Sequence, residues 1–183
     1  MNGARRWSEP FAQAWADVAG TELRVARELR AFELRAVRPP RLPDGRFREA
    51  TGADAPLLER WLVAFGEDIG EPITPEDAAD FVARTLRGRD LAVWDEGGRP
   101  VSLAVVGRRT PWSSSIGPVY TPPELRGRGI ASAAVAALSQ RELDAGRRWC
   151  SLFTDLANPT SNHIYTDLGY EPRCDFRLFE LRW

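Results

Sequence analysis

From about residue 46 onward, apolar residues recur at two different spacings, and this alternation predicts a mixed α/β domain. Residues 54–66 carry leucine, tryptophan and phenylalanine at helical spacing. Residues 74–86 begin with Thr-Pro-Glu-Asp, which is typical of a helix N-terminus, and are expected to form a second helix. A third and longer helix is expected from about residue 130 to Ala145, because Gly146 is placed to end it.

Short apolar runs between and after these helices predict strands. The turn Asp95-Glu-Gly-Gly-Arg99 separates two of these runs in the manner of a hairpin. The expected strands are Phe47 to Ala50, Leu91 to Trp94, Val101 to Val106, residues 115–121 and Trp149 to Asp155. A helix around Tyr165 and a last pair of strands complete the chain, so that helices and strands are interspersed.

The composition narrows the class of partner. A chain of 183 residues with 43% apolar residues is long and apolar enough to bury a substantial core. The formal net charge of −1 favours neither nucleic acid nor an anionic membrane surface as a partner. The longest apolar run, residues 130–138, is too short to span a bilayer, and the N-terminus has no hydrophobic signal core. We therefore expect a cytoplasmic protein.

The residue types available for catalysis are few. Cys150 and Cys174 have no metal or redox spacing, and we expect free thiols in a reducing compartment. His163 is the single histidine and has no motif around it, so an exposed helical position is expected. Lysine is absent, which excludes Schiff-base chemistry on a lysine, and zinc clusters lack their ligands. Carboxylates, tyrosines and backbone groups remain.

The segment Val119-Tyr-Thr-Pro-Pro-Glu-Leu-Arg-Gly-Arg-Gly-Ile-Ala131 carries the strongest functional signal in the chain. Its pattern predicts a strand, a Pro-Pro corner and a glycine-rich turn that opens the long helix. Glycines let a ligand approach the backbone closely, and the first N–H groups of a helix have no internal partner. With the helix dipole behind them, these groups favour a phosphate or pyrophosphate. The turn therefore predicts a site for a phosphorylated cofactor.

Several interpretations of this glycine turn compete. A nucleoside-triphosphate loop needs a lysine after its glycines, and this chain has none. A dinucleotide-binding turn has a third glycine three residues after the second, where this chain has Ser132, and it opens a βαβ fold instead of following several other elements. A basic loop that only caps the helix also stays open.

A further interpretation comes from a family resemblance. Arg126-x-x-Gly129-x-Ala131 fits the pattern Arg/Gln-x-x-Gly-x-Gly/Ala and resembles the pyrophosphate loop of the GNAT superfamily of N-acetyltransferases, which hold acetyl-CoA. Asn158-x-x-Ser-x-x-Ile-Tyr-x-x-Leu-Gly-Tyr170 looks like the second cofactor-binding segment of the same enzymes. Asn158 is placed there as an N-cap and Gly169 as a left-handed helix end. The resemblance covers roughly residues 46–183 and implies the GNAT (acyl-CoA N-acyltransferase) fold, a mixed, mostly antiparallel sheet flanked by helices.

The resemblance also implies a mechanism, in which acetyl-CoA gives its acetyl group directly to an amine without a metal. Tyr165 would be the catalytic acid that protonates the departing thiolate, and a free N–H near Val119 would polarise the thioester carbonyl. Asn158 would bond the pantetheine arm. The implied cofactor-binding residues are Val119, Tyr120, Thr121, Arg126, Gly127, Arg128, Gly129, Ile130, Ala131, Ser132 and Asn158.

The amine acceptor is a small molecule, a peptide or a protein terminus, and no motif selects among them. Glu67, Asp68 and Glu71 are candidates to attract a cationic acceptor or relay its proton, although a solvated acidic turn explains them equally well. The general base is left unassigned. A catalytically degenerate acyl-CoA-binding module with a regulatory or interaction role is the alternative function.

The first forty residues contain sequence motifs that resemble motifs near the end of the chain. Arg30-Ala-Phe-Glu-Leu-Arg35 resembles Arg177-Leu-Phe-Glu-Leu-Arg182, and the run from Pro10 to Gly20 has the spacing of the run from Pro159 to Gly169. Chance in a chain rich in Arg, Glu and Leu is the alternative explanation. The apolar residues between 25 and 36 also suit a helix, so the strand assignment there stays open.

We interpret residues 1–43 as a helix plus strands, the tail of a degenerate GNAT-like repeat with a stiff proline-rich linker at 39–43. The acetyltransferase domain would then cover residues 44–183. Ala16 stands where Tyr165 stands in the second copy, so the first copy is expected to be inactive. The chain could on this basis be a piece of a tandem protein, and its remaining strands leave a homodimer open.

Overall fold

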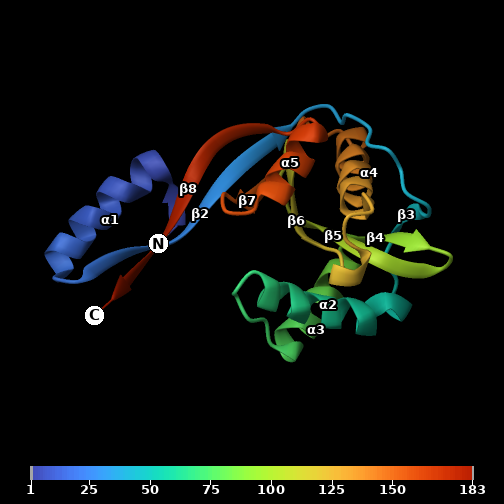
Figure 1. Ribbon diagram of the computed structural model, residues 1–183, viewed down its shortest axis with the longest axis horizontal. Helices are drawn as coiled ribbons and strands as arrows, with labels where there is room; N and C mark the ends of the chain where they lie inside the picture. The colour runs from blue at the N-terminus through green and yellow to red at the C-terminus, as the bar shows by residue number, and fades with distance from the viewer. Residues whose placement is uncertain (1, 183) are drawn as a thin grey trace.

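The computed structural model describes residues 2–182, which form one eight-stranded sheet with helices on both faces (Figure 1). The strands are β1 (Asn2–Ala4), β2 (Glu22–Leu34), β3 (Arg46–Glu49), β4 (Leu91–Glu96), β5 (Arg99–Arg109), β6 (Ser113–Tyr120), β7 (Trp149–Asp155) and β8 (Glu171–Arg182). The helices are α1 (Arg5–Ala19), α2 (Ala55–Asp68), α3 (Pro75–Arg87), α4 (Ile130–Asp144) and α5 (Pro159–Asp167), with short 3₁₀ turns η1 (Gly52–Asp54) and η2 (Pro123–Leu125).

The strand order is β1-β8-β2-β7-β6-β5-β4-β3, and within residues 2–182 only β6 and β7 are parallel neighbours. The crossover between these two strands is α4, as expected for a parallel connection. Every other neighbouring pair is antiparallel. The expected mixed, mostly antiparallel sheet is therefore confirmed.

Two apolar clusters lie on opposite faces of this sheet. Residues of β4 alternate between them: Ala92 and Trp94 belong to the cluster under α4, whereas Leu91 and Val93 belong to the cluster under α2 and α3. Figure 1 shows α4 and α5 on one side of the sheet and α2 and α3 on the other. The alanine-rich sequence of α4 has a physical reason, since small buried side chains such as Ala133 let the helix lie close to the strands.

The predicted elements from residue 46 to α5 are confirmed, with shifts of one to three residues at their ends. Thr74 accepts a hydrogen bond from the Asp77 backbone N–H at 3.1 Å and so caps α3. Gly146 follows α4 with a φ of 89°. Among the described residues, no helix is both long and apolar enough to cross a membrane.

The prediction for the end of the chain was wrong. Residues 171–182 form the single strand β8 instead of a pair of strands. Its partner inside the sheet is β2, which comes from the first forty residues and pairs with β7 on its other edge. Residues 22–34 are thus a strand and not a helix.

The segment β1-α1-β2 is arranged like the segment β7-α5-β8. β1 pairs with the outer edge of β8 as β7 pairs with the outer edge of β2, and β2 and β8 run antiparallel between them (Figure 1). Arg30 and Arg177, the first residues of the two similar motifs, make matching ion pairs across this junction, with Asp175 and Glu28 respectively, each at 2.7 Å. The domain assignment stays a prediction, and the sheet shows that β2 completes the strands of residues 44–183.

Candidate active site

The parallel strands β6 and β7 separate soon after they begin to pair. Their register runs from Ser113 opposite Trp149 to Ser115 opposite Ser151, and the two strands share no further pairs in the described chain. Beyond that point β6 pairs only with β5 on its other edge. The sheet is therefore divided between β6 and β7, with α4 and α5 on one face of the sheet and α2 and α3 on the other.

An irregularity in β6 lies next to this division. Ile116 pairs with Val106 and Val119 pairs with Ala104, so that Gly117 and Pro118 together oppose a single residue of β5. Such a bulge bends a strand and interrupts its ladder of hydrogen bonds. Pro118 also has no backbone N–H to contribute to the ladder. The bulge thus directs β6 away from β7 immediately before Val119.

The glycine turn leads from the end of β6 into α4. Gly127 and Gly129 have φ values of 76° and 77°, the left-handed conformation that favours glycine. A side-chain carbon added at Gly127 would meet no atom within 4 Å, and one at Gly129 would meet only the Arg41 carbonyl oxygen at 3.9 Å. The space over the turn is therefore open to a ligand.

The N-terminus of α4 has no side-chain cap. Its first hydrogen bond between backbone groups runs from the Ala133 N–H to the Gly129 carbonyl at 3.0 Å. The N–H groups of Ile130, Ala131 and Ser132 consequently have no acceptor within the helix. Together with the helix dipole, they make this exposed turn a favourable place for an anion.

The two arginines of the turn are tied to the protein and do not project over the helix end. Arg126 donates to the Thr121 carbonyl at 2.9 Å and makes an ion pair with Asp68. Arg128 donates to both carboxylate oxygens of Glu96, at 2.8 and 3.0 Å. These contacts hold the shape of the turn, so binding of an anion depends mainly on the backbone N–H groups.

Of the residues predicted at the end of β6, Val119 has its side chain on the face of α4, and Thr121 is buried with its hydroxyl donating to the Ser102 hydroxyl at 2.8 Å. Val119 packs against the same apolar cluster as α4, whereas the next residue, Tyr120, is buried on the opposite face. The Tyr120 ring lies 6.2 Å from Trp61 and 6.5 Å from Phe65, and burial raises the pKa of its phenol. Tyr120 can therefore reach a cofactor on the α4 side only through its backbone.

The start and end of α5 agree with the sequence prediction. The Asn158 side-chain oxygen accepts a hydrogen bond from the Ser161 N–H at 3.0 Å, Pro159 is the first helical residue, and Gly169 has a φ of 98°. The capping bond occupies the carboxamide oxygen of Asn158, and its amide N–H groups remain to bind a ligand. His163 is exposed and lies 3.3 Å from Asp167, as expected for a solvated helical position.

Tyr165 projects from α5 into an aromatic environment. Its ring lies 6.4 Å from Phe32 of β2 and 5.9 Å from Tyr170, and it packs against the same apolar cluster as Val119. Burial raises the pKa of the Tyr165 phenol to about 12. The neighbouring Tyr170 hydroxyl bonds to Ser139 at 2.7 Å, whereas no described residue hydrogen-bonds the Tyr165 hydroxyl. Tyr165 thus presents a protonated and available phenol on the face that α4 covers.

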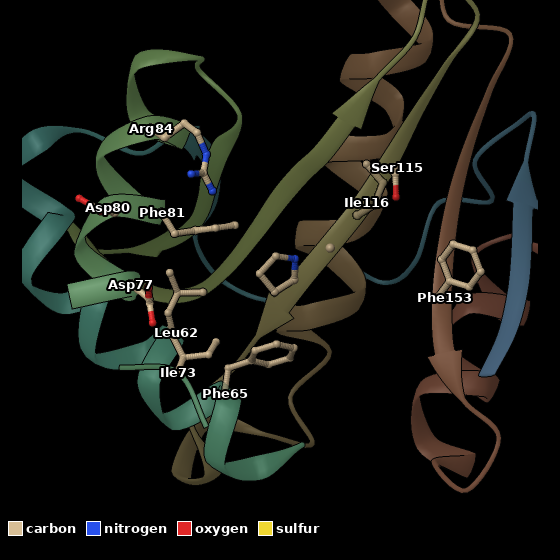
Figure 2. A pocket seen from close by; sticks show the side chains of 12 residues that line it. Leu62, Phe65, Ile73, Asp77, Asp80, Phe81, Arg84, Ser115, Ile116 and Phe153 are labelled. Carbon is tan, nitrogen blue, oxygen red and sulfur yellow. The ribbon is translucent and has the colours of Figure 1, made fainter. Parts of the chain in front are cut away.

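A cavity of about 640 Å³ lies on the opposite side of the divided sheet, between α2, α3 and β6 (Figure 2). Its walls are mainly aromatic and aliphatic, with three charged residues from α3. The lining residues are Leu62, Phe65, Ile73, Asp77, Asp80, Phe81, Arg84, Ser115, Ile116, Gly117, Pro118 and Phe153. The cavity includes the β6 bulge and one residue of β7, so it borders the place where the two strands separate.

Known proteins are similar to this chain in a segment of sequence and in fold. Residues 98–178, which include the glycine turn, α4, β7 and α5, match the family model described as FR47-like protein. A GCN5-related N-acetyltransferase from Sphaerobacter thermophilus superimposes with a TM-score of 0.75 at 21% identity, over 99% of this chain and 58% of that protein. The chain has the GNAT fold.

Two further solved structures agree with the GNAT fold. An acetyltransferase of the GNAT family from Colwellia psychrerythraea has a TM-score of 0.65 at 14% identity, over 92% of this chain and 60% of its own. An acetyltransferase from Clostridium acetobutylicum, solved with acetyl-CoA, has a TM-score of 0.57 at 19% identity. The match covers 69% of this chain and 89% of that protein. No curated protein matches the chain closely enough to count as a relative. The GNAT-fold chain spans only 58% and 60% of the first two proteins.

The acidic turn between α2 and α3 is largely neutralised in this GNAT-fold chain. Asp68 pairs with Arg126, and Glu71 pairs with Arg27 of β2 at 2.7 Å. Arg27 also donates to the Ile69 carbonyl. None of the three predicted candidates, Glu67 included, lines the cavity. The general base is thus unassigned, and the described residues hold no cluster of three or more His, Cys, Asp or Glu side chains placed to share a metal ion.

The cavity could not be predicted from the sequence. Its residues come from α2, α3, β6 and β7, and they are brought together only by the sheet. Two local signals were present: Phe81 and Arg84 are three residues apart on one helix, and Gly117-Pro118 interrupts an otherwise regular strand. Neither signal by itself indicates a binding site, since both patterns are common on exposed helices and at strand bends.

Proposed function

We propose that this chain transfers an acetyl group from acetyl-CoA to an amine by direct attack. The observation that carries the proposal is the division of the sheet between β6 and β7, with an open glycine turn on one side and a cavity on the other. A cofactor and an acceptor can approach the same point of β6 from opposite faces. The GNAT fold and the related structure solved with acetyl-CoA support the choice of cofactor.

In this proposal the pyrophosphate of acetyl-CoA binds the N–H groups of the glycine turn, mainly those of Arg128, Gly129 and Ala131. The pantetheine arm then lies along the edge of β6 that β7 leaves unpaired and bonds backbone groups of Val119 and Thr121. The Asn158 amide is the remaining contact. This places the thioester beside the bulge, where a backbone N–H near Val119 stabilises the oxyanion.

The reaction forms a bond between the amine nitrogen and the thioester carbon and then breaks the carbon–sulfur bond. The amine loses a proton, and the CoA thiolate gains one. Tyr165 is the proposed donor, and its raised pKa keeps it protonated throughout the physiological range. With a pKa of about 12, complete transfer to a thiolate of ordinary pKa is uphill by about 5 kcal/mol. The phenol therefore acts chiefly by hydrogen bonding to the sulfur as negative charge develops, and the thiolate takes its proton from solvent once it leaves the site.

The degenerate acyl-CoA-binding module differs from this proposal in one measurable respect. It would bind acetyl-CoA at the same turn without releasing thiol to any amine. The degenerate-repeat assignment of residues 1–43, the acetyltransferase domain at 44–183, the cytoplasmic location and the homodimer all stay predictions. The matching ion pairs of Arg30 and Arg177 support the first of these.

The experiment that tests the function compares thermal unfolding with acetyl-CoA, free CoA, NADH and ATP, followed by thiol release with a panel of amines. A ligand at about 100 times its dissociation constant adds roughly 2.7 kcal/mol to the free energy of unfolding. We expect stabilisation by acetyl-CoA and CoA only, and thiol release with at least one amine. Stabilisation without release would favour the binding module, and stabilisation by NADH or ATP instead would refute the cofactor assignment.

A further inference from the structure

Three charged residues of α3 line the cavity, and they differ in what they are free to bind. The Asp77 carboxylate accepts a hydrogen bond from the Thr74 hydroxyl at 2.6 Å, within the cap of the helix. The Asp80 carboxylate turns to the outer side of α3 (Figure 2). Arg84 and Phe81 instead extend from α3 toward the cavity, and the guanidinium carbon of Arg84 lies 5.4 Å from the centre of the Phe81 ring.

Arg84 also differs from the other arginines around the site. Arg27, Arg126 and Arg128 each make an ion pair with a carboxylate. No acidic side chain in the described chain pairs with Arg84, whose recorded partner is the Phe81 ring. A guanidinium that stacks on an aromatic ring keeps its N–H groups in a fixed plane, which suits recognition of a carboxylate by two parallel hydrogen bonds.

Between Arg84 and β6 the cavity is apolar. Leu62, Phe65 and Phe81 form the wall on the side of α2 and α3 (Figure 2), and Pro118 is part of the lining on the side of β6. A ligand that crosses this space gains by burying an apolar surface, at roughly 25 cal/mol per Å². The cavity therefore favours a ligand with an apolar, ring-sized body.

The two ends of the cavity have different chemistry. Pro118 directly precedes Val119, beside which the thioester lies in the proposed function, so the reactive amine belongs at the β6 end. Arg84 provides the positive charge at the α3 end. A compound with an amine and a carboxylate on opposite ends of an apolar body would satisfy both ends and the walls between them.

We propose that the acceptor is an amine that carries a carboxylate at the far end of an apolar body, and that Arg84 binds this carboxylate. The proposal rests on the proposed function for the identity of the amine as the reacting group. The placement of Arg84 and the apolar walls does not depend on it, because these residues would bind the acid whether or not acetyl transfer follows.

The test uses three amines of equal ring size: 4-(aminomethyl)benzoate, its primary amide 4-(aminomethyl)benzamide, and 4-(aminomethyl)benzylamine, a diamine. We expect the acid to have about a tenfold higher kcat/KM than the amide, because only the acid can form a bidentate ion pair with the guanidinium. Arg84→Gln should lower kcat/KM for the acid to about that of the amide, and should lower kcat/KM for the amide much less. Arg84→Lys should restore part of the preference.

Arg87→Gln is the matched control, since Arg87 is exposed on the same helix and does not line the cavity. Equal rates for the acid and the amide, a preference for the diamine, or an acid preference that persists in Arg84→Gln would each overturn the proposal. Phenylalanine as a better substrate than the acid would also overturn it, because its amine and carboxylate share one carbon.

Calorimetric binding of the acid and the amide, without acetyl-CoA, separates this proposal from the proposed function. Arg84-dependent binding of the acid without acetylation of any amine would refute the transferase and leave the carboxylate site standing. Acetylation of other amines without Arg84-dependent acid binding would refute the carboxylate site and leave the transferase standing.

Discussion

Glu142 is a buried carboxylate that holds α4 to β5 and to the start of β6. Its replacement by glutamine tests how much these contacts contribute to the free energy of unfolding. The Glu142 side chain is 3% exposed. It accepts two hydrogen bonds from Arg109, both at 2.9 Å, and one from the Ser114 hydroxyl at 2.7 Å. Arg141 adds a contact at 3.0 Å. Ser114 lies in the short parallel register with β7, so this network secures the closed end of the divided sheet.

The magnitude follows from the ionisation of this carboxylate. Burial alone would raise the pKa of Glu142, but hydrogen bonds from Arg109, Ser114 and Arg141 outweigh burial and lower the pKa from 4.5 to about 2. Such a difference corresponds to about 3 kcal/mol of stability. Because the folded pKa is below the unfolded one, this contribution is complete above pH 4.5 and is lost as the pH falls toward 2.

An independent argument gives a similar value. Removing one partner of a buried ion pair costs about 3–5 kcal/mol, because the other charge is left uncompensated. Arg109 also pairs with Asp90, which remains after the substitution and limits the cost to the lower end of that range. We therefore expect Glu142→Gln to lower the free energy of unfolding by about 3 kcal/mol at pH 7.

Urea unfolding at pH 7 and pH 3.5 measures the stability lost in Glu142→Gln and how that loss depends on pH. At pH 3.5 protonation has already removed about 1.5 kcal/mol from the wild-type protein, so the difference between wild type and Glu142→Gln should fall to about half. Asp144→Asn is the control, an exposed acid on the same helix, and should change stability by less than about 0.5 kcal/mol at either pH. A loss below about 1 kcal/mol at pH 7, or an equal difference at the two pH values, would refute the reasoning.

Three further predictions concern the site and the thiols. Gly129→Val should abolish acetyl-CoA binding in calorimetry. The control is Gly146→Val at the other end of α4, where the φ is similarly positive and the space is also open, and it should lower stability but keep the affinity for acetyl-CoA. Equal affinities of the two variants would refute the glycine-turn site. Tyr165→Phe should lower kcat about 100-fold at unchanged acetyl-CoA affinity, and because the phenol has a pKa of about 12, the wild-type rate should show no loss from its ionisation up to pH 10. Cys150 is buried with a pKa raised to about 12 whereas Cys174 is exposed, so Ellman's reagent should titrate one thiol in the folded protein and two in urea; two fast thiols in the folded state would contradict the described packing.

Most individual elements could be predicted from the sequence because their signals are local. Thr74 and Asn158 cap helices through bonds to residues three positions ahead, and Gly146 and Gly169 end helices by adopting a positive φ. These interactions need no distant partner. The same holds for the glycine turn, whose open N–H groups follow from the conformation of a few adjacent residues.

The pairing of strands could not be predicted in the same way. β8 was expected as two strands because local patterning does not reveal that β2, more than a hundred residues earlier in the chain, lies between β7 and β8. Between residues 25 and 36 the apolar spacing suited helix and strand alike, and only the pairing with two neighbours makes β2 a strand. Tyr120 shows the same limit, since its position in the motif does not indicate which face of the sheet its ring occupies.

The sequence alone determined, within a few residues, where α2 to α5 begin and end, the glycine-rich turn before α4, and the resemblance that indicates the GNAT fold. Tertiary structure decided the division between β6 and β7, the burial that raises the pKa of Tyr165, and the cavity that Arg84 and Pro118 both line. The physical reason is the range of the interactions. Caps and turns join residues a few positions apart, whereas strand pairing, burial and cavities depend on residues that meet only when the whole sheet is assembled.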